Sequence, residues 1–155
     1  DCNWSNYYPS DNYPFMYKCR SANSSIIKYR YADVLLLKAE ALIMQDTPDL
    51  EGAADIIDKV RDRAKLGALP TSVRSNKNAM LNALLKERRL ELAFEGQRWF
   101  DLVRLDKVEE VMNAVYAKDS GRKAQIYTFD KNSYRLPIPQ SVIDANDKIH
   151  QNPGY

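Results

Sequence analysis

The sequence predicts an all-α fold with one minor extended segment, and two observations support this expectation. Apolar residues recur with a helical period over most of residues 29–117, which is typical of helices that pack on one another. After Gly121 that period is lost, and two prolines follow apolar residues in the run from Leu136 to Pro139. Because a residue that precedes proline avoids the helical region, this run is predicted to be extended.

The first 28 residues differ in composition from the rest of the chain. Residues 1–28 are rich in Tyr, Asn and Pro and show no regular period, so we expect loops or short extended pieces there. Residues 29–155 are expected to form the helical domain. The chain opens without Met, and we expect it to be the C-terminal part of a larger exported protein. Cys2 and Cys19 could form a disulfide, or they could be two unrelated thiols.

The first predicted helix runs from Tyr29 to Met44 and is apolar on both sides. A helix that is apolar all round is normally buried between neighbours, so we expect this one to be the most buried. One apolar stripe consists of Tyr31, Val34, Leu35, Ala41 and Leu42, and the other consists of Leu36, Leu37, Ala39 and Ile43.

A second helix is predicted to begin with Thr47 as its N-cap and Pro48 in its first turn, and to end before Gly67 and Pro70. Its opposite side is charged and should face water. Together the two helices have the size of the antiparallel hairpin found in tetratricopeptide-type repeats. The apolar face of the second helix consists of Ala53, Ile56, Ile57, Val60 and Ala64.

Two more main helices are expected, from about Ser75 to Glu95 and from about Asp106 to Ala117. Beyond them, residues 125–129 could form a short strand, Pro139 should start a short helix that ends near Ala145, and residues 151–155 should form a turn. The apolar positions of the two main helices are Leu81, Leu84, Leu85 and Leu92 in the third, and Val108, Val111, Met112 and Val115 in the fourth.

The composition argues against several classes of function. The formal net charge is only +2, which does not indicate a nucleic-acid groove, and no apolar run approaches the ~20 residues that span a bilayer. The single histidine, His150, has no Cys or His partner at metal-binding spacing, and no glycine-rich phosphate loop occurs. We therefore expect neither a metal nor another cofactor.

The charged block from Lys86 to Arg104 is the densest in the chain. Its carboxylates Glu87, Glu91 and Glu95 recur every four residues, so a catalytic carboxylate pair is conceivable. The surrounding arginines favour a structural lattice of ion pairs instead, because such pairing keeps carboxylates ionised. In this interpretation Arg88, Arg89, Arg98 and Arg104 pair with Glu87, Glu91, Glu95 and Asp101, and the rings of Phe94, Trp99 and Phe100 anchor the block in the core.

The aromatic N-terminal segment is the best candidate for ligand contacts. Aromatic rings offer flat faces on which a sugar ring can stack, and neighbouring Asn and Asp side chains could bind hydroxyl groups. We expect Trp4, Tyr7 and Tyr8 to make such contacts before any helical residue does. The alternative is that these rings only pack on the helical body.

Five segments resemble motifs of the SusD/RagB outer-membrane nutrient-uptake proteins of Bacteroidetes, and they occur in that family's order. The longest resembles the family's ERRLELAFEGxRWFDLxR segment and the first its RYADVLLLYAEAL helix. The segments are residues 29–42 (YRYADVLLLKAEAL), 60–66 (VRDRAKL), 87–104 (ERRLELAFEGQRWFDLVR), 136–139 (LPIP) and 151–155 (QNPGY).

The resemblance implies a non-catalytic surface lipoprotein with a tetratricopeptide-like SusD-type fold. It further implies that the protein binds oligosaccharide and lies over a SusC-like TonB-dependent transporter in the outer membrane, held by a lipid anchor upstream of this chain. Two departures, Lys38 and the Lys65-Leu66-Gly67 run, concern only local surface positions. A helical adaptor for other proteins and a helical glycoside hydrolase are the alternative functions.

Overall fold

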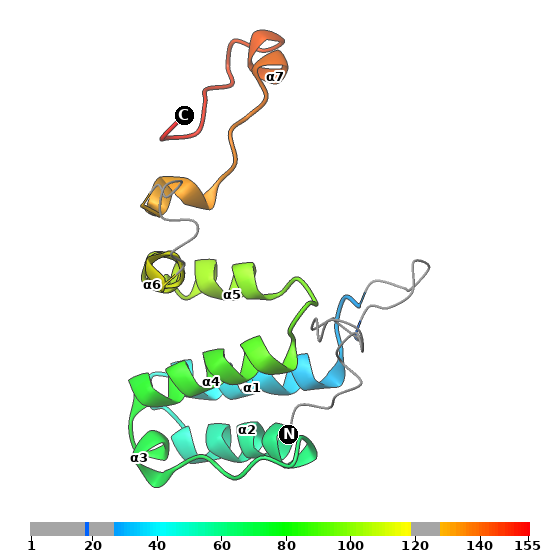
Figure 1. The fold of residues 1–155 in the computed structure, drawn as a ribbon, viewed down its shortest axis with the longest axis vertical. Helices are drawn as coiled ribbons and strands as arrows, with labels where there is room; N and C mark the ends of the chain where they lie inside the picture. Colours follow the sequence, from blue (N-terminus) through cyan, green and yellow to red (C-terminus); the bar gives the residue numbers. More distant parts are fainter. Residues whose placement is uncertain (1–17, 19–26, 119–127) are drawn as a thin grey trace, which may run out of the picture. The chain divides into compact units, whose positions relative to one another are not determined.

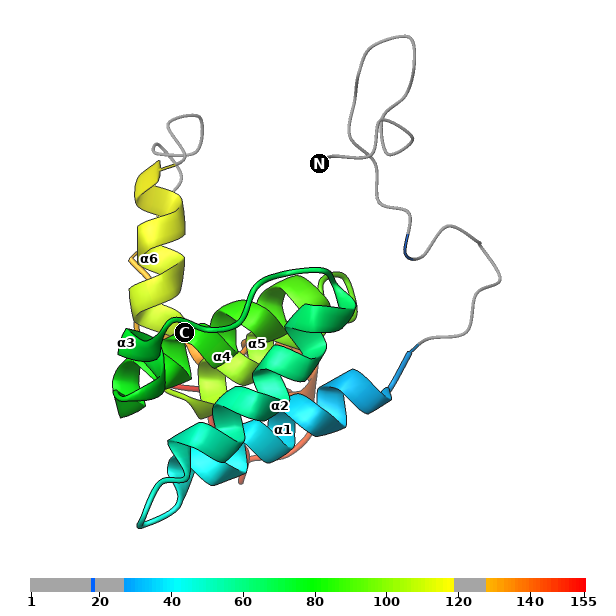
Figure 2. The ribbon, with the colours of Figure 1, turned by 90° about the horizontal axis from the view of Figure 1, so that it is seen from below.

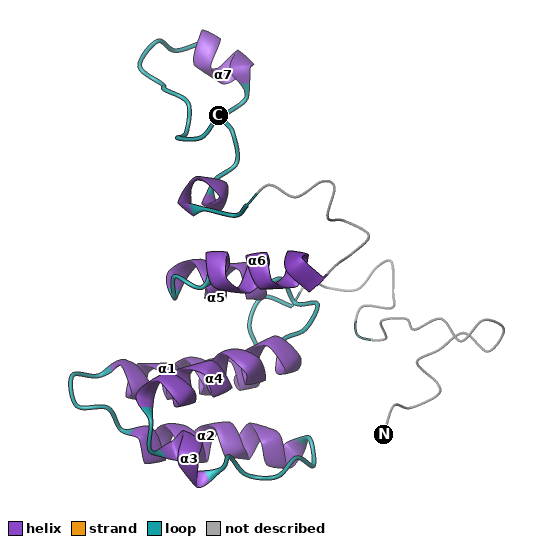
Figure 3. Cartoon of the chain, turned by 60° about the vertical axis from the view of Figure 1, so that its left-hand side comes forward, coloured by secondary structure: helices purple, strands orange, loops and turns teal. Residues whose placement is uncertain are grey.

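The computed structural model describes Lys18, residues 27–118 and residues 128–155. Within these residues every regular element is a helix and none is a strand, as Figure 3 shows, so the predicted all-α class is confirmed. The chain divides into two compact units, residues 1–98 and residues 99–155. The expected boundary after residue 28 stays a prediction, because most of residues 1–28 lie outside the described part.

The first unit is built on an antiparallel hairpin of α1 (Tyr31–Met44) and α2 (Leu50–Arg63), which Figure 2 shows side by side. The amide of Asp49 donates to the Leu42 carbonyl at 3.1 Å and closes the turn between them. The predicted hairpin is therefore present. The residues that form its fully buried interior are Leu36, Ala39, Ile43, Ala53, Ala54 and Ile57.

Only one of the two apolar sides of α1 is buried in this unit, so the prediction that both sides are covered is wrong for the described residues. Leu36 and Ile43 lie in the core, whereas Val34 of the other stripe is 53% exposed. Leu37, at the edge of the buried stripe, is 38% exposed. Both sides are apolar in sequence, so periodicity could not tell which of them packs against α2. Leu35 and Leu42 of the outer stripe are half-buried against the edge of the core, and Tyr31 and Val34 are exposed.

The N-cap of α2 is Asp49 rather than the predicted Thr47. The Asp49 carboxylate accepts a hydrogen bond from the backbone N–H of Gly52 at 2.9 Å, which satisfies one of the free donors of the first turn. A Cβ atom on Gly52 would collide with that carboxylate, so glycine suits this position. Both Thr and Asp can cap a helix, and sequence alone did not separate them.

The predicted helix from Ser75 to Glu95 corresponds to α4 (Lys77–Glu91), and the short helix α3 (Thr71–Arg74) that precedes it was not predicted. Asn76 separates them, because its side chain accepts from the Ala79 N–H at 2.9 Å and caps α4. Figure 1 shows α4 beside α1, and its residues Met80 and Leu84 complete the core of the unit. The helix stops at Glu91, well before the predicted Glu95.

Helix α5 (Arg98–Arg104) begins one residue before the boundary of the second unit and belongs to it in all its other residues. The other helices of this unit are α6 (Val108–Lys118), the 3-10 helix η3 (Lys131–Tyr134) and α7 (Gln140–Asp144). The fourth predicted helix corresponds to α6, whereas α5 was not predicted separately. The side chain of Asn113 in α6 pairs with both the N–H and the C=O of Phe129, at 2.9 and 3.0 Å. Phe129 lies in a loop and not in the predicted strand, of which residues 125–127 are outside the described part.

The extended run at Leu136 to Pro139 is confirmed, and α7 follows it as predicted. The Gln151 side chain accepts from the Ile138 N–H at 2.8 Å and donates to the Ile138 C=O at 2.9 Å. Asn152 donates to the Leu136 carbonyl at 2.6 Å. The terminal motif thus binds the extended run as a neighbouring strand would, through side-chain amides.

Candidate functional site

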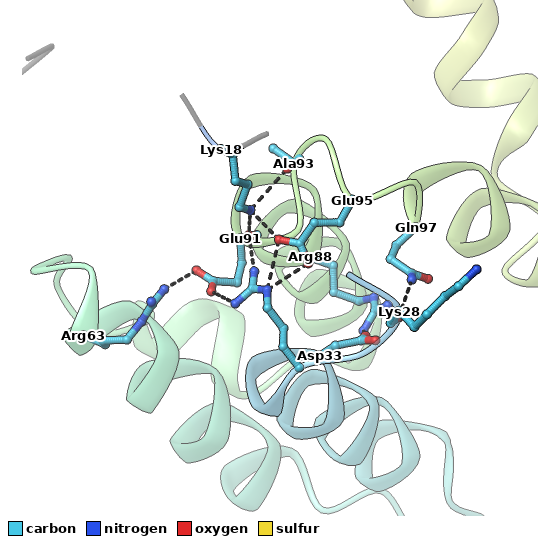
Figure 4. Close-up of polar contacts among 10 residues, drawn as sticks. Lys18, Lys28, Asp33, Arg63, Arg88, Glu91, Ala93, Glu95 and Gln97 are labelled. Carbon is cyan, nitrogen blue, oxygen red and sulfur yellow. Dashed lines mark hydrogen bonds and ion pairs between the residues drawn. The ribbon is translucent and has the colours of Figure 1, made fainter. Parts of the chain in front are cut away.

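A cluster of charged side chains connects the start of α1, the end of α2 and the end of α4 (Figure 4). The Glu91 carboxylate accepts from Arg30 Nη1 and from Arg63 Nη2, each at 2.5 Å. Glu95 accepts from Arg30 Nε at 2.8 Å and also from Lys18. We call these five residues the ionic cluster.

Two further ion pairs continue this arrangement toward the core. Arg88 Nη1 lies 2.9 Å from Asp33 Oδ1, and Arg61 Nη1 lies 3.0 Å from Glu87 Oε2. The predicted ion-pair lattice therefore exists, but most of its predicted partners are wrong. The predicted contact between Arg104 and Asp101 is present at 2.7 Å.

The carboxylates Glu87, Glu91 and Glu95 pair with arginines and a lysine from other segments of the chain, not with the neighbouring arginines of their own block. The reason is geometric. The arginines next to these glutamates in sequence point in other directions around α4, whereas α1 and α2 pack against the side of α4 that carries the glutamates. Spacing within one block of sequence shows only neighbours on the same helix, and not partners on other helices.

The electrostatics of the ionic cluster argue against acid catalysis by its carboxylates. Burial opposes the ionisation of Glu95, but hydrogen bonds from Arg30 and Lys18 outweigh burial and lower its pKa below the usual range. The hydrogen bond to Glu95 in turn raises the pKa of Arg30. A general acid needs a raised pKa, so these groups act as fixed charges that hold three segments together.

The aromatic residues of the block do not form the predicted core anchor. Phe94 is 69% exposed and Phe100 is 65% exposed, so that prediction is wrong for both. Trp99 is half-buried and meets Tyr134 edge to face, with ring centroids 6.4 Å apart. Phe94 has a φ of 66°, an unfavourable value for a bulky side chain, and it lies in the turn that ends α4. That turn directs its ring away from the core.

An open pocket of about 440 Å³ lies beside the ionic cluster, where the N-terminus of α1 meets the C-terminus of α2. The Nζ atom of Lys59 lies 5.9 Å from the centre of the Tyr31 ring. We call this site the Tyr31 pocket. Its lining consists of Arg30, Tyr31, Ala32, Leu35, Lys59, Val60 and Arg63.

The sequence interpretation missed the Tyr31 pocket, because it assigned Tyr31 to a buried stripe and Lys59 to a wet helical face. The signal that could have revealed it is the register of the hairpin. In an antiparallel pair the first residues of α1 lie opposite the last turns of α2, which brings Tyr31 near Lys59 and Arg63.

The predicted ligand contacts Trp4, Tyr7 and Tyr8 lie outside the described residues, as do Cys2 and Cys19. They stay predictions. His150 is exposed. Across the described ranges, no group of three or more His, Cys, Asp or Glu side chains is placed to hold a metal ion, and no helix there has both the length and the apolarity to cross a bilayer.

A pocket on an ion-paired helical scaffold is typical of a helical binding protein. The sequence model of the SusD family matches residues 4–155, so this chain belongs to the SusD family. The resemblance noted in the sequence is thereby confirmed. SusD-like proteins are binding proteins rather than enzymes.

Two curated relatives from Formosa agariphila are similar to the chain. SusD-like protein P38 is 42% identical over 99 residues, covering 60% of this chain and 19% of the relative. SusD-like protein P2 is 35% identical over 143 residues, covering 88% of this chain and 27% of the relative. The chain thus spans less than a third of the length of either relative.

A solved structure has the same fold. The crystal structure of a SusD-like protein from Bacteroides fragilis superposes with a TM-score of 0.67 and 29% sequence identity. The match covers 94% of this chain and 29% of that one. This likeness supports the tetratricopeptide-like SusD-type fold that the sequence predicted.

Proposed function

We propose that the protein of which this chain is a part captures oligosaccharide at the cell surface and delivers it to a SusC-like TonB-dependent outer-membrane transporter. Membership of the SusD family is the observation that carries this proposal. The ionic cluster supports it, because carboxylates that arginines hold ionised are suited to a rigid scaffold and poorly suited to glycoside hydrolysis.

The proposed location is the outer membrane, as a surface-exposed lipoprotein. The lipid anchor would belong to a part of the polypeptide upstream of residue 1. Labelling of intact cells with a membrane-impermeant reagent tests surface exposure directly.

Trp4, Tyr7 and Tyr8 are the proposed sugar contacts in the N-terminal segment. Stacking of a sugar ring on an aromatic face needs an exposed ring beside hydrogen-bonding side chains, and this segment offers both in its sequence. The competing explanation is that the rings pack on other parts of the protein, in which case their removal would lower stability without changing the affinity for glycan.

Calorimetric titration of the purified protein with a panel of oligosaccharides tests the proposed function. We expect at least one glycan to bind, and Ala substitution of Trp4, Tyr7 or Tyr8 to weaken its binding about tenfold, roughly the loss of one stacked ring. Tyr29→Ala is the matched control, because Tyr29 is 76% exposed and lies outside both that segment and the Tyr31 pocket.

The same titration separates the alternatives. A helical adaptor would bind no glycan in the panel, and its partner would be another protein. Transporter delivery is tested by co-purification from detergent-solubilised outer membranes, where a TonB-dependent transporter should accompany the protein. Absence of any such transporter from the purified complex would leave glycan capture standing and remove delivery.

A further inference from the structure

We propose that the Tyr31 pocket binds a negatively charged sugar residue, one that carries a carboxylate or a sulfate ester. This inference rests on the proposed function, because it names the class of glycan that the protein would accept. It uses residues of α1 and α2 that are separate from Trp4, Tyr7 and Tyr8.

The first reason is the charge of the pocket. Three of its lining side chains, Arg30, Lys59 and Arg63, are cationic, and no carboxylate side chain lines it. Glu91 and Glu95 offset Arg30, and Glu91 also meets Arg63. Lys59 has no carboxylate within ion-pair distance among the described residues, so the pocket keeps a positive charge that an anionic ligand would compensate.

The second reason is that two residues of the lining, Lys59 and Arg63, keep unused hydrogen-bond donors. Arg63 is 65% exposed at its side chain and uses only Nη2 in its contact with Glu91, within the described residues. Its remaining guanidinium N–H groups and the three ammonium N–H groups of Lys59 are available to ligand oxygens. Arginine binds carboxylate and sulfate-like oxygens in a planar fork, while lysine acts as a point charge.

The third reason is the apolar part of the lining. Tyr31 is 68% exposed, and Leu35 and Val60 lie beside it in the pocket. Such a surface suits the C–H face of a sugar ring, and a volume of about 440 Å³ is within the ~300–1,000 Å³ of small-molecule sites. A free inorganic anion would use only the cations and leave the Tyr31 ring without a role.

The ionic cluster gives the pocket a rigid cationic wall. Arg30 is fixed from one side by both Glu91 and Glu95, and the same Glu91 holds Arg63 on the other helix. Cationic groups that are already in place lose little side-chain entropy when a ligand binds. Lys59 is the exception: its contact with the exposed Tyr31 ring is near the ~6 Å limit for a cation and an aromatic ring, so a ligand anion can displace it at little cost.

The test is a titration of the purified protein at low salt with three size-matched oligosaccharides: one neutral, one made of uronic acids and one sulfated. We expect at least one charged glycan to bind tenfold or more tightly than the neutral one, and its affinity to fall as salt is added. The two charged glycans distinguish carboxylate from sulfate recognition.

Variants locate the binding. Lys59→Gln and Tyr31→Ala should each lower the affinity for the charged glycan at least tenfold, and Lys59→Arg should retain most of that affinity. Lys38→Gln, an exposed cation of α1 outside the pocket lining, should have no effect. Equal binding of neutral and charged glycans, or an undiminished affinity in Lys59→Gln, would overturn this inference and leave glycan capture intact. Failure of all three glycans to bind would count against both.

Discussion

Asp33 of α1 and Arg88 of α4 form a buried ion pair, with Oδ1 and Nη1 2.9 Å apart and side chains only 4% and 2% exposed. The two residues are 55 positions apart in sequence. Charges removed from water need close partners, so this pair fixes the register between the two helices. α1 also lines the Tyr31 pocket with α2, and α4 supplies Glu91 to the ionic cluster.

Asp33→Ala should therefore lower the free energy of unfolding by about 3–5 kcal/mol, the usual loss when one partner of a buried ion pair is removed. The double variant Asp33→Ala with Arg88→Met, compared with the two single variants, measures how strongly the two side chains are coupled. Urea denaturation of the three proteins measures this. A loss of less than about 1 kcal/mol in Asp33→Ala would show that the pair does not hold α1 against α4.

Asp49→Ala should destabilise the first unit by about 1 kcal/mol, because the N–H of Gly52 loses its partner at the start of α2. Thr47→Ala should change stability by less than about 0.5 kcal/mol, since Thr47 precedes the cap. Thermal unfolding of both variants decides between the two residues. The reverse order of effects would return the cap to Thr47.

Stability should decrease as the pH falls below the usual Glu pKa of about 4.3. The pKa of Glu95 is lower in the folded protein than in the unfolded chain, so the unfolded chain binds the proton first on acidification. The contribution of Glu95 is fully present above pH ~4.3 and is lost as the pH falls through its folded pKa.

Glu95→Gln should remove that part of the acid dependence, measured as the slope of unfolding free energy between about pH 5 and pH 3. Glu109→Gln is the control, because Glu109 lies in α6, outside the ionic cluster. An unchanged slope in Glu95→Gln would mean that Arg30 and Lys18 do not stabilise its ionised form.

Gln151→Ala should release the extended run from the terminal motif, because both backbone groups of Ile138 lose their partner. We expect hydrogen exchange at the Ile138 amide to become roughly tenfold faster, which corresponds to a decrease of about 1.4 kcal/mol in the free energy of local opening. Gln140→Ala, which removes only an exposed contact with Asp144, is the matched control. Equal exchange rates in both variants would show that the prolines alone keep this run extended.

The helical class, the α1–α2 hairpin and the extended run could be predicted from the sequence because each depends on local signals. Helical period, helix-ending glycine and proline, and the effect of proline on its predecessor all act within a few residues. The short helix α3 was missed, because its four residues are too few to show a helical period.

The partners of the charged residues and the Tyr31 pocket could not be predicted in the same way. Glu91 takes its partners from Arg30 and Arg63, which are far from it in sequence, and the pocket exists only where two antiparallel helices meet. The outer side of α1 shows the same limit: Val34 and Leu36 are equally apolar, yet only Leu36 is buried. Tertiary packing decides such cases, and single-sequence periodicity does not contain it.

The most direct test of the central claim is to recover the glycan after binding. The purified protein is incubated with a glycan that it binds, the complex is denatured, and the released sugar is analysed by mass spectrometry. A capture protein returns the glycan at its original mass and in stoichiometric amount. Shortened products that disappear in a folded Glu91→Gln variant would contradict the account, because they would make a carboxylate of the ionic cluster catalytic.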